Sequence, residues 1–261
     1  MKEQLASYWR LVSGGVTASS LLLYPIRRRL PQGRNRLDLR SGESLRSTPE
    51  EQLLTLVEEV WVAEKYRPPD WSPTPSMTVV DVGANVGVFT TWAAHRLRAR
   101  RVVAVEPAGD SVEQLRDNLR RNGVEAEIVQ AALGGESGQR LLYRRGAPSL
   151  DTLYHHDRYN STFSEVEIVS VLTLDEIFSR FALDRCDLLK LDCEGAEYEI
   201  LGATTPATLK KIRHVVGEYH VGLNDHESLE LADILERAEF DVRLFPLLDV
   251  EGGYLHAARR R

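Results

Sequence analysis

The sequence predicts an α/β fold with a seven-stranded, mostly parallel sheet whose last strand is reversed, preceded by a helical N-terminal extension. From Thr78 onward, short β-branched runs alternate with helical stretches, as in parallel βαβ units. The last two strands are joined near Gly252 and Gly253 by a connection too short for a crossover helix, so they should pair antiparallel. With 261 residues, 43% of them hydrophobic, the chain can form a large core without disulfides.

The expected elements follow from this alternation. Strands are expected near residues 78–82, 101–106, 125–131, 186–192, 212–219, 239–245 and 253–257, and helices near 86–98, 109–122, 195–202 and 225–238. Residues 139–171 do not fit the alternation. They are expected to form an extra hairpin with a polar loop from Ser149 to Thr162.

Two parts of the chain are expected: a helical N-terminal extension, residues 1–47, and a main domain, residues 48–261. Residues 3–29 favour one or two helices, which Pro25 should break or kink. A short strand is expected over residues 36–40, where the pattern alternates.

The main domain is expected to begin with a capped helix. Thr48 can serve as the N-cap, with Pro49 at the first helical position and Glu51 completing a capping box. This helix should run to about Val62. A proline-rich connector, residues 68–75, then leads into the first strand of the sheet.

Charge is distributed unevenly along the chain. Residues 1–46 carry nine Lys/Arg and three Asp/Glu, a net of +6, so the remainder carries −12. An acidic domain argues against a nucleic-acid partner, because phosphate binding needs a broad basic face. With two cysteines and no convincing signal peptide, a cytoplasmic location is expected. The apolar stretch 16–26 is too short to span a bilayer, so no stable membrane insertion is expected.

The most informative segment, residues 78–90, combines an apolar strand, a glycine turn and a helix start. The strand ends in Asp81, which can order the turn or meet the ammonium of a ligand, and Gly83 and Gly87 follow. This arrangement holds a nucleoside-bearing cofactor at the edge of a parallel sheet. A nicotinamide dinucleotide site would need the G-x-G-x-x-G turn, whose third glycine is missing here. S-adenosylmethionine, which has no phosphate, is therefore the expected cofactor, and a nicotinamide-binding domain is the weaker alternative.

Contacts to this cofactor can be assigned along the strand ends. Gly83 lets the ligand approach the backbone closely. Glu106, which ends the second strand just before Pro107, is placed to bridge the ribose hydroxyls. Adenine is expected at the end of the third strand, near Gln130 and Ala131.

A second strand-to-helix segment, residues 188–201, carries four acids near the carboxyl end of its strand, where open α/β sheets place their sites. Asp192 is the best placed, either as a base facing the reacting methyl group or as a ligand of a divalent cation. Glu194, Glu197 and Glu199 lie in the first helical turns and can simply complement the helix dipole. That simpler explanation is preferred for Glu199 and left open for the other two.

The fifth strand adds Glu218 and His220, which alternation places on one face, with Tyr219 on the other. Asp192, Glu218 and His220 are therefore the candidate catalytic residues, although His220 fits a structural role equally well. A hydroxyl is a poor nucleophile at neutral pH, so a base or a metal should assist it. Asp192 with Glu218, and His220 in a wider set, could hold Mg²⁺, which prefers oxygen ligands.

Four segments together resemble the FkbM family of methyltransferases: residues 81–87 (DVGANVG), 105–107 (VEP), 171–175 (VLTLD) and 190–201 (KLDCEGAEYEIL). The resemblance covers roughly residues 60–257 and implies the class I methyltransferase (Rossmann-like) fold. It implies that the turn and the second strand bind S-adenosylmethionine, through Asp81, Gly83, Ala84, Asn85, Gly87 and Glu106. It also implies that Asp192 lies beside the reacting centre. Tyr66 matches a family tyrosine that closes over the cofactor.

Family members with known activity are mostly O-methyltransferases, so the resemblance implies methylation of a hydroxyl on a small metabolite, sugar or polyketide-type natural product. Two alternatives stay open: an N-methyltransferase acting on an amine or peptide, and a protein that binds S-adenosylmethionine without transferring its methyl group. The expected partner is a small-molecule acceptor. The N-terminal helices could also join copies of the chain into a homo-oligomer.

Overall fold

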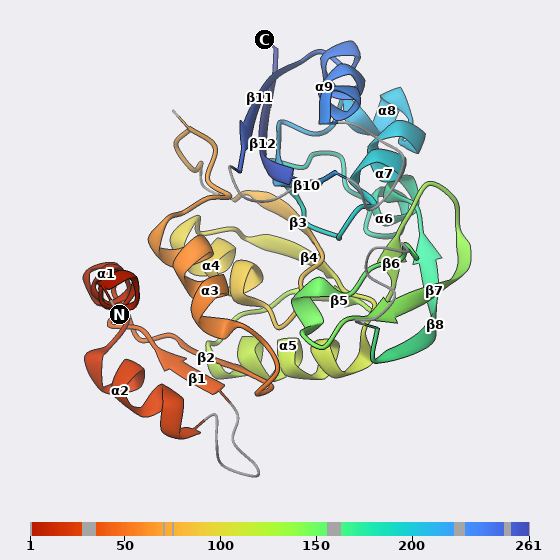
Figure 1. Ribbon diagram of the computed structural model, residues 1–261. Coiled ribbons are helices and arrows are strands. Elements are labelled where there is room, and N and C mark those ends of the chain that lie inside the picture. Colours follow the sequence, from red (N-terminus) through yellow and green to blue (C-terminus); the bar gives the residue numbers. More distant parts are fainter. Residues whose placement is uncertain are drawn as a thin grey trace.

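The computed structural model describes residues 2–27, 35–69, 71–74, 76–155, 163–221, 228–247 and 252–260. The central sheet is built from β3 (Thr78–Val82), β4 (Arg101–Val105), β5 (Glu127–Val129), β9 (Leu188–Leu191), β10 (His214–His220), β11 (Phe240–Pro246) and β12 (Gly252–Arg259). Its seven strands lie in the order β11-β12-β10-β9-β3-β4-β5. Figure 1 labels β3, β4, β5, β10, β11 and β12 among them. β12 runs antiparallel to both β10 and β11, whereas the pairs from β10 to β5 are parallel. The predicted sheet, with its reversed last strand, is confirmed.

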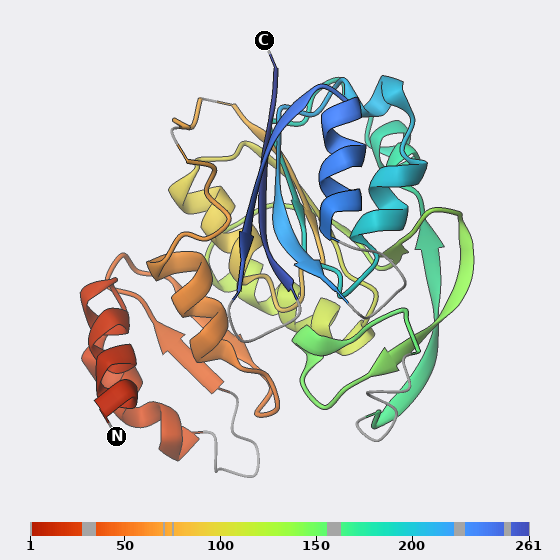
Figure 2. The same ribbon diagram turned by 45° about the horizontal axis from the view of Figure 1, so that its top comes forward.

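Helices cover both faces of this sheet, as Figure 2 shows. They are α4 (Val88–Arg96), α5 (Gly109–Arg121), α6 (Leu174–Arg180), α7 (Glu197–Ala203), α8 (Pro206–Leu209) and α9 (Ser228–Arg237). Successive residues of the strands pack into two different hydrophobic cores. Val80 and Val82 pack with apolar residues of α6, α7 and α9, whereas Val79 and Val102 pack with those of α4 and the N-terminal part. This two-sided burial explains why the strands read as continuous apolar runs.

The N-terminal part contributes to the second core. It contains α1 (Lys2–Ser13), α2 (Ala18–Arg27), the antiparallel pair β1 (Asn35–Asp38) and β2 (Ser44–Ser47), α3 (Leu53–Val57) and the π-helical turn η1 (Glu58–Val62). Leu11, Leu37 and Leu45 are at most 1% exposed within that core. The division at residue 47 stays a prediction, as does assembly through α1 and α2, on which Trp9 and Leu22 are exposed.

The structure contradicts two local details predicted for this part. Pro25 does not break the helices, because it lies inside α2 and the break falls after Ser13, at Gly14 and Gly15; a kink at Pro25 stays a prediction. Thr48 does not cap a helix, because α3 begins only at Leu53. Glu51, the expected capping-box partner, is fully buried and bonds to other segments of the chain.

A small second sheet confirms the extra hairpin expected over residues 139–171. β7 (Gly138–Arg144) pairs antiparallel with β8 (Glu165–Leu172), and β6 (Ala132–Leu133) pairs parallel with β8 on its other side. The short 3₁₀ turn η2 (Pro148–Leu150) follows β7 and leads toward the carboxyl edge of the main sheet. Among the helices in the described part of the chain, none has the length and apolar character that crossing a membrane requires.

Candidate active site

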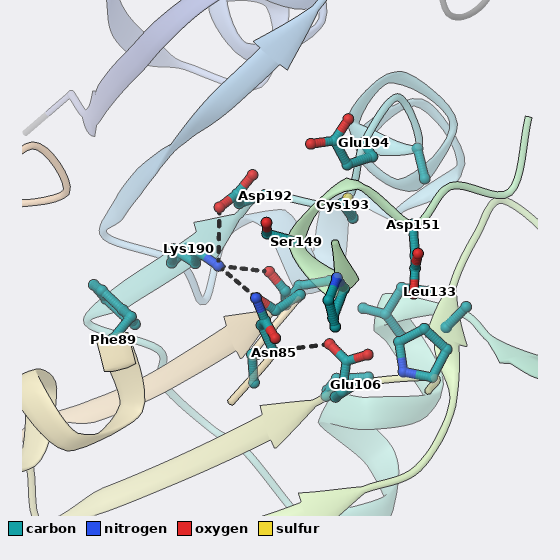
Figure 3. A pocket seen from close by; sticks show the side chains of 18 of the residues that line it. Asn85, Phe89, Glu106, Leu133, Ser149, Asp151, Lys190, Asp192, Cys193 and Glu194 are labelled. Atoms are coloured by element: carbon teal, nitrogen blue, oxygen red, sulfur yellow. Dashed lines mark hydrogen bonds and ion pairs between the residues drawn. The ribbon is translucent and has the colours of Figure 1, made fainter. Parts of the chain in front are cut away.

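A cleft opens between the carboxyl edge of β3, β4 and β9 and the loop around η2 (Figure 3). This is the edge at which open α/β sheets bind their ligands. Much of its wall is apolar, including Leu133, Leu142 and Leu153. The sequence-predicted residues that line it are Tyr66, Gly83, Ala84, Asn85, Glu106, Pro107, Ala131 and Asp192.

The turn after β3 is held in a conformation that restricts its residues. Gly83 has a φ of +73°, and a Cβ on it would lie 1.8 Å from the backbone oxygen of Asp192. Glycine is therefore required at this position because the chain's own carbonyl approaches it, and not only because a ligand does. Asn85 also adopts a left-handed φ, of +47°.

Asp81 lies beneath this turn and does not line the cleft. Its carboxylate is fully buried, accepts a hydrogen bond from the Thr90 hydroxyl at 2.6 Å, and lies 3.3 Å from Nζ of Lys190. Lys190 in turn donates to the backbone oxygen of Gly83 at 2.7 Å. Of the two roles predicted for Asp81, the geometry favours ordering the turn over contacting a ligand.

Gly87 and Gln130 also lie outside the lining of the cleft. Gly87 is the N-cap of α4, with a φ of +84°, and a Cβ there would lie 2.4 Å from the side chain of Leu115 on α5. It therefore serves the packing of α4 on α5. Gln130 is exposed on the surface, whereas its neighbour Ala131 faces the cleft.

Glu106 stands at the carboxyl end of β4, only 7% exposed. Its two carboxylate oxygens accept hydrogen bonds from the backbone N–H groups of Asn85 at 2.9 Å and Ala108 at 3.0 Å. Burial raises the pKa of Glu106 to about 7, although the two backbone hydrogen bonds favour the charged form and lower the pKa. The side chain is thus fixed at the floor of the cleft, with free lone pairs on each oxygen for hydroxyl donors.

Asp192, directly after β9, meets two other segments at the far end of the cleft. The Tyr66 hydroxyl lies 3.0 Å from Oδ2 of Asp192 and 3.1 Å from Oε1 of Glu218, so one proton is shared between two carboxylates. Burial, and next the charge of Asp192, raises the pKa of Glu218 to about 7. Nζ of Lys190 lies 3.5 Å from Oδ2 of Asp192 (Figure 3). Asp192 is therefore held between a hydroxyl and an ammonium group.

His220 projects from the end of β10 on the same face as Glu218, and Tyr219 is buried on the other face, as alternation predicts. Its ring nitrogens lie 3.3 Å from Oε1 of Glu197 and 3.6 Å from Oε1 of Glu194. Burial opposes protonation, but these two carboxylates outweigh it and raise the pKa of His220 well above its ordinary value. A protonated His220 is not a general base, so the geometry favours the structural role for it.

The three acids after Asp192 have different partners. Glu197, 1% exposed, accepts the backbone N–H groups of Cys193 and Gly195, both at 3.0 Å. Glu199 instead forms an ion pair with Arg140 of β7 at 2.5 Å. Glu197 thus fixes the backbone that follows Asp192, and Glu199 holds the Arg140 side chain of the hairpin, so each does more than complement the helix dipole.

Asp192, Glu218 and His220 are brought together as predicted for a metal site, with one ligand atom from each within 4.8 Å of the others. Two carboxylates and an imidazole are a suitable donor set for a divalent cation. Binding through His220 would displace its proton, so Asp192 and Glu218 are the stronger pair of ligands.

Sequence reasoning missed several residues of the site. Lys190 is 3% exposed, and its position within an apolar strand was a signal, because a buried lysine needs a partner. Ser149 and Asp151 reach the cleft from the hairpin loop. Burial raises the pKa of Asp151 to about 6. No pattern in the loop itself marks these two residues.

A family model and several known methyltransferases are similar to this chain. The family model described as methyltransferase FkbM domain matches residues 81–242. The 31-O-demethyl-FK506 methyltransferase FkbM of Streptomyces tacrolimicus is 26% identical over 219 residues, which cover 74% of this chain and 80% of that protein. Methyltransferase 1 of Beauveria bassiana is 26% identical over 219 residues, covering 73% of this chain and 86% of that one.

A longer relative and a solved structure complete the comparison. The AMB antimetabolite synthetase AmbE of Pseudomonas aeruginosa is 28% identical over 244 residues; these cover 80% of this chain but only 12% of that protein. The crystal structure of methyltransferase FkbM from Methylobacillus flagellatus aligns with a TM-score of 0.50 and 17% identity, over 79% of this chain and 54% of that one. This structural likeness supports the class I methyltransferase fold.

Proposed function

This chain belongs to the methyltransferase FkbM family, and from that membership we propose that it transfers a methyl group from S-adenosylmethionine to a hydroxyl oxygen of a small molecule. One juxtaposition carries the proposal: Glu106 and Asp192 line the same cleft. The name of the Streptomyces tacrolimicus relative specifies methylation at an oxygen, which favours O-methylation over the N-methyl alternative.

The residues of the cleft fit S-adenosylmethionine, which would supply an activated methyl group on its sulfonium. Glu106 would accept hydrogen bonds from the ribose hydroxyls, because a carboxylate at the end of this strand can accept from the two neighbouring hydroxyl groups. The apolar wall that includes Ala131 and Leu133 would receive the adenine. The turn at Gly83 and the carboxylate of Asp192 would face the methionine part.

Asp192 is the residue best placed to take the proton of an acceptor hydroxyl. Tyr66 and Lys190 fix its position, so it could meet the acceptor with little loss of entropy. Glu218 lies on the other side of the Tyr66 hydroxyl from Asp192. Because its pKa is about 7, it can accept or release a proton near neutral pH. The chain thereby supplies alignment and proton acceptance.

The direct test is turnover. Purified protein would be incubated with S-adenosylmethionine and a panel of hydroxyl acceptors, matched amine acceptors and no acceptor, and S-adenosylhomocysteine release would be measured. Product with hydroxyl compounds supports O-methylation, whereas product only with amines supports the N-methyl alternative. Binding without turnover on any acceptor would favour a protein that only holds the cofactor.

We further propose that Asp192 and Glu218 can bind Mg²⁺, with His220 as a third ligand. If a metal activates the acceptor, EDTA should lower turnover by at least about tenfold, within the range expected for a Lewis acid, and added Mg²⁺ should restore it. Rates before and after chelation, with metal content measured in parallel, would check this. Unchanged turnover in EDTA with no bound metal would remove the metal and leave Asp192 acting alone.

Cofactor binding should depend on pH through Glu106. Its pKa of about 7 in the free protein should fall when ribose hydroxyls donate to the carboxylate, so binding releases a proton. Affinity for S-adenosylhomocysteine should therefore be full above pH 7 and weaken as the pH falls below it. Calorimetric titrations from pH 5.5 to 8.5, in buffers of different ionisation enthalpy, would measure this release. An affinity that rises on acidification would contradict it.

A further inference from the structure

Glu51 makes an unusual set of contacts for a residue that precedes a helix. It is fully buried, and each carboxylate oxygen accepts two hydrogen bonds. Oε1 accepts from the Gln52 backbone at 2.7 Å and the Ser149 hydroxyl at 2.8 Å. Oε2 accepts from the Asn85 side chain at 2.8 Å and the Ser149 backbone at 2.9 Å. One carboxylate thus joins the segment before α3, the turn after β3 and the hairpin loop.

These contacts lead directly to the cleft. Asn85 and Ser149 both line it, and the backbone N–H of Asn85 donates to Glu106. Because Nδ2 of Asn85 donates to Glu51, the orientation of the Asn85 amide is determined. Its Oδ1 is then left buried without a hydrogen-bond partner in the part of the chain that the structure describes. A buried acceptor of this kind is costly unless a ligand donates to it.

We propose that Glu51 is a positioning residue of the cofactor site: it orients the amide of Asn85 toward a donor of the ligand and ties the hairpin loop to the same turn. The inference rests on the proposed function, since it takes the ligand of the cleft to be S-adenosylmethionine. Glu51 lies outside residues 81–242, the part that matches the family model, so the family motifs do not reveal it.

The test is calorimetric titration with S-adenosylhomocysteine of the wild type and of Glu51→Gln. Each carboxylate oxygen of Glu51 accepts two hydrogen bonds. Glutamine replaces one of these oxygens with an NH₂ group, which is a donor and would face the N–H or O–H donors at either position, so two of the four hydrogen bonds are lost. Affinity should fall by about tenfold or more, the effect of leaving buried polar groups unpaired near a ligand.

A merely structural role would also lower stability, so a double-mutant cycle with Asn85→Ala is the decisive readout. If Glu51 acts through Asn85, the loss of affinity caused by Glu51→Gln should be smaller by about threefold or more in the Asn85→Ala background, and the remaining loss is the part that Glu51 exerts through Ser149. Glu43→Gln is the matched control. Glu43 is another buried glutamate of the N-terminal part (5% exposed), but it faces His95, and this variant should bind normally.

If Glu51→Gln does not fold, the contact between Glu51 and Asn85 can be tested with the variant Asn85→Asp instead. A second carboxylate facing Glu51 should weaken binding more than Asn85→Ala does, because like charges repel at this distance. Equal affinity of the two Asn85 variants would overturn the inference. The inference would also be overturned if Glu51→Gln bound with wild-type affinity. The same holds if Glu51→Gln lowered the affinity as much in the Asn85→Ala background as in the wild type. Failure of the wild type itself to bind would instead overturn the proposed function, and this inference with it.

Discussion

Replacing Asp192 by asparagine is expected to lower kcat by about 100-fold to 10,000-fold, the range for loss of a positioned base. Asparagine keeps the size of the side chain but cannot accept a proton. Glu218 cannot simply substitute, because it lies behind the Tyr66 hydroxyl, with which Asp192 shares a proton. Affinity for S-adenosylhomocysteine should change much less than the rate. Initial rates and calorimetry on the same preparations would separate the two effects.

Asp187→Asn provides the control for this variant. Asp187 directly precedes β9 and Asp192 directly follows it, so the two acids lie at opposite ends of this strand. Asp187 is 4% exposed and accepts a hydrogen bond from the Thr78 backbone. Its loss should lower thermal stability and leave kcat nearly unchanged. A flat response of kcat to Asp192→Asn would remove the base and favour the N-methyl alternative, in which the acceptor needs less assistance.

The strands and the general position of the site could be predicted because both are local properties of the chain. An apolar run flanked by turn residues is a buried strand wherever it occurs, and polar residues at its carboxyl end reach the site edge. Glu106 and Asp192 follow this rule, and both line the cleft. The hairpin of β7 and β8 was likewise visible as a break in the alternation.

Predictions failed where a residue's role depends on a partner distant in the sequence. For Asp81 the sequence left two roles open, and its ion pair with Lys190, more than a hundred residues away, favours the one that orders the turn. Glu51 fitted a local capping box, but bonds to Asn85 and Ser149 hold it elsewhere. Helix-cap and turn patterns describe local alternatives, and tertiary hydrogen bonds decide between them.

Replacing Glu106 by alanine is expected to weaken binding of S-adenosylhomocysteine by about 10-fold to 100-fold, the effect of losing hydrogen bonds to a charged group. Two losses act together. The ribose hydroxyls would have no carboxylate to donate to, and the backbone N–H groups of Asn85 and Ala108 would lose their acceptors at the floor of the cleft. Calorimetric titration of the wild type and the variant at pH 8, where Glu106 is ionised, would measure the difference.

Glu127→Ala is the matched control, because Glu127 lies on the neighbouring strand β5 and pairs with Arg101 on the surface, away from the cleft. It should bind with wild-type affinity. S-adenosylmethionine and S-adenosylhomocysteine share the ribose, so Glu106→Ala should weaken both by similar factors. Loss of S-adenosylmethionine binding alone would place Glu106 near the sulfonium instead of the ribose. No loss with either ligand would mean that the cleft holds the nucleoside in another way, through Asp151 or the turn itself.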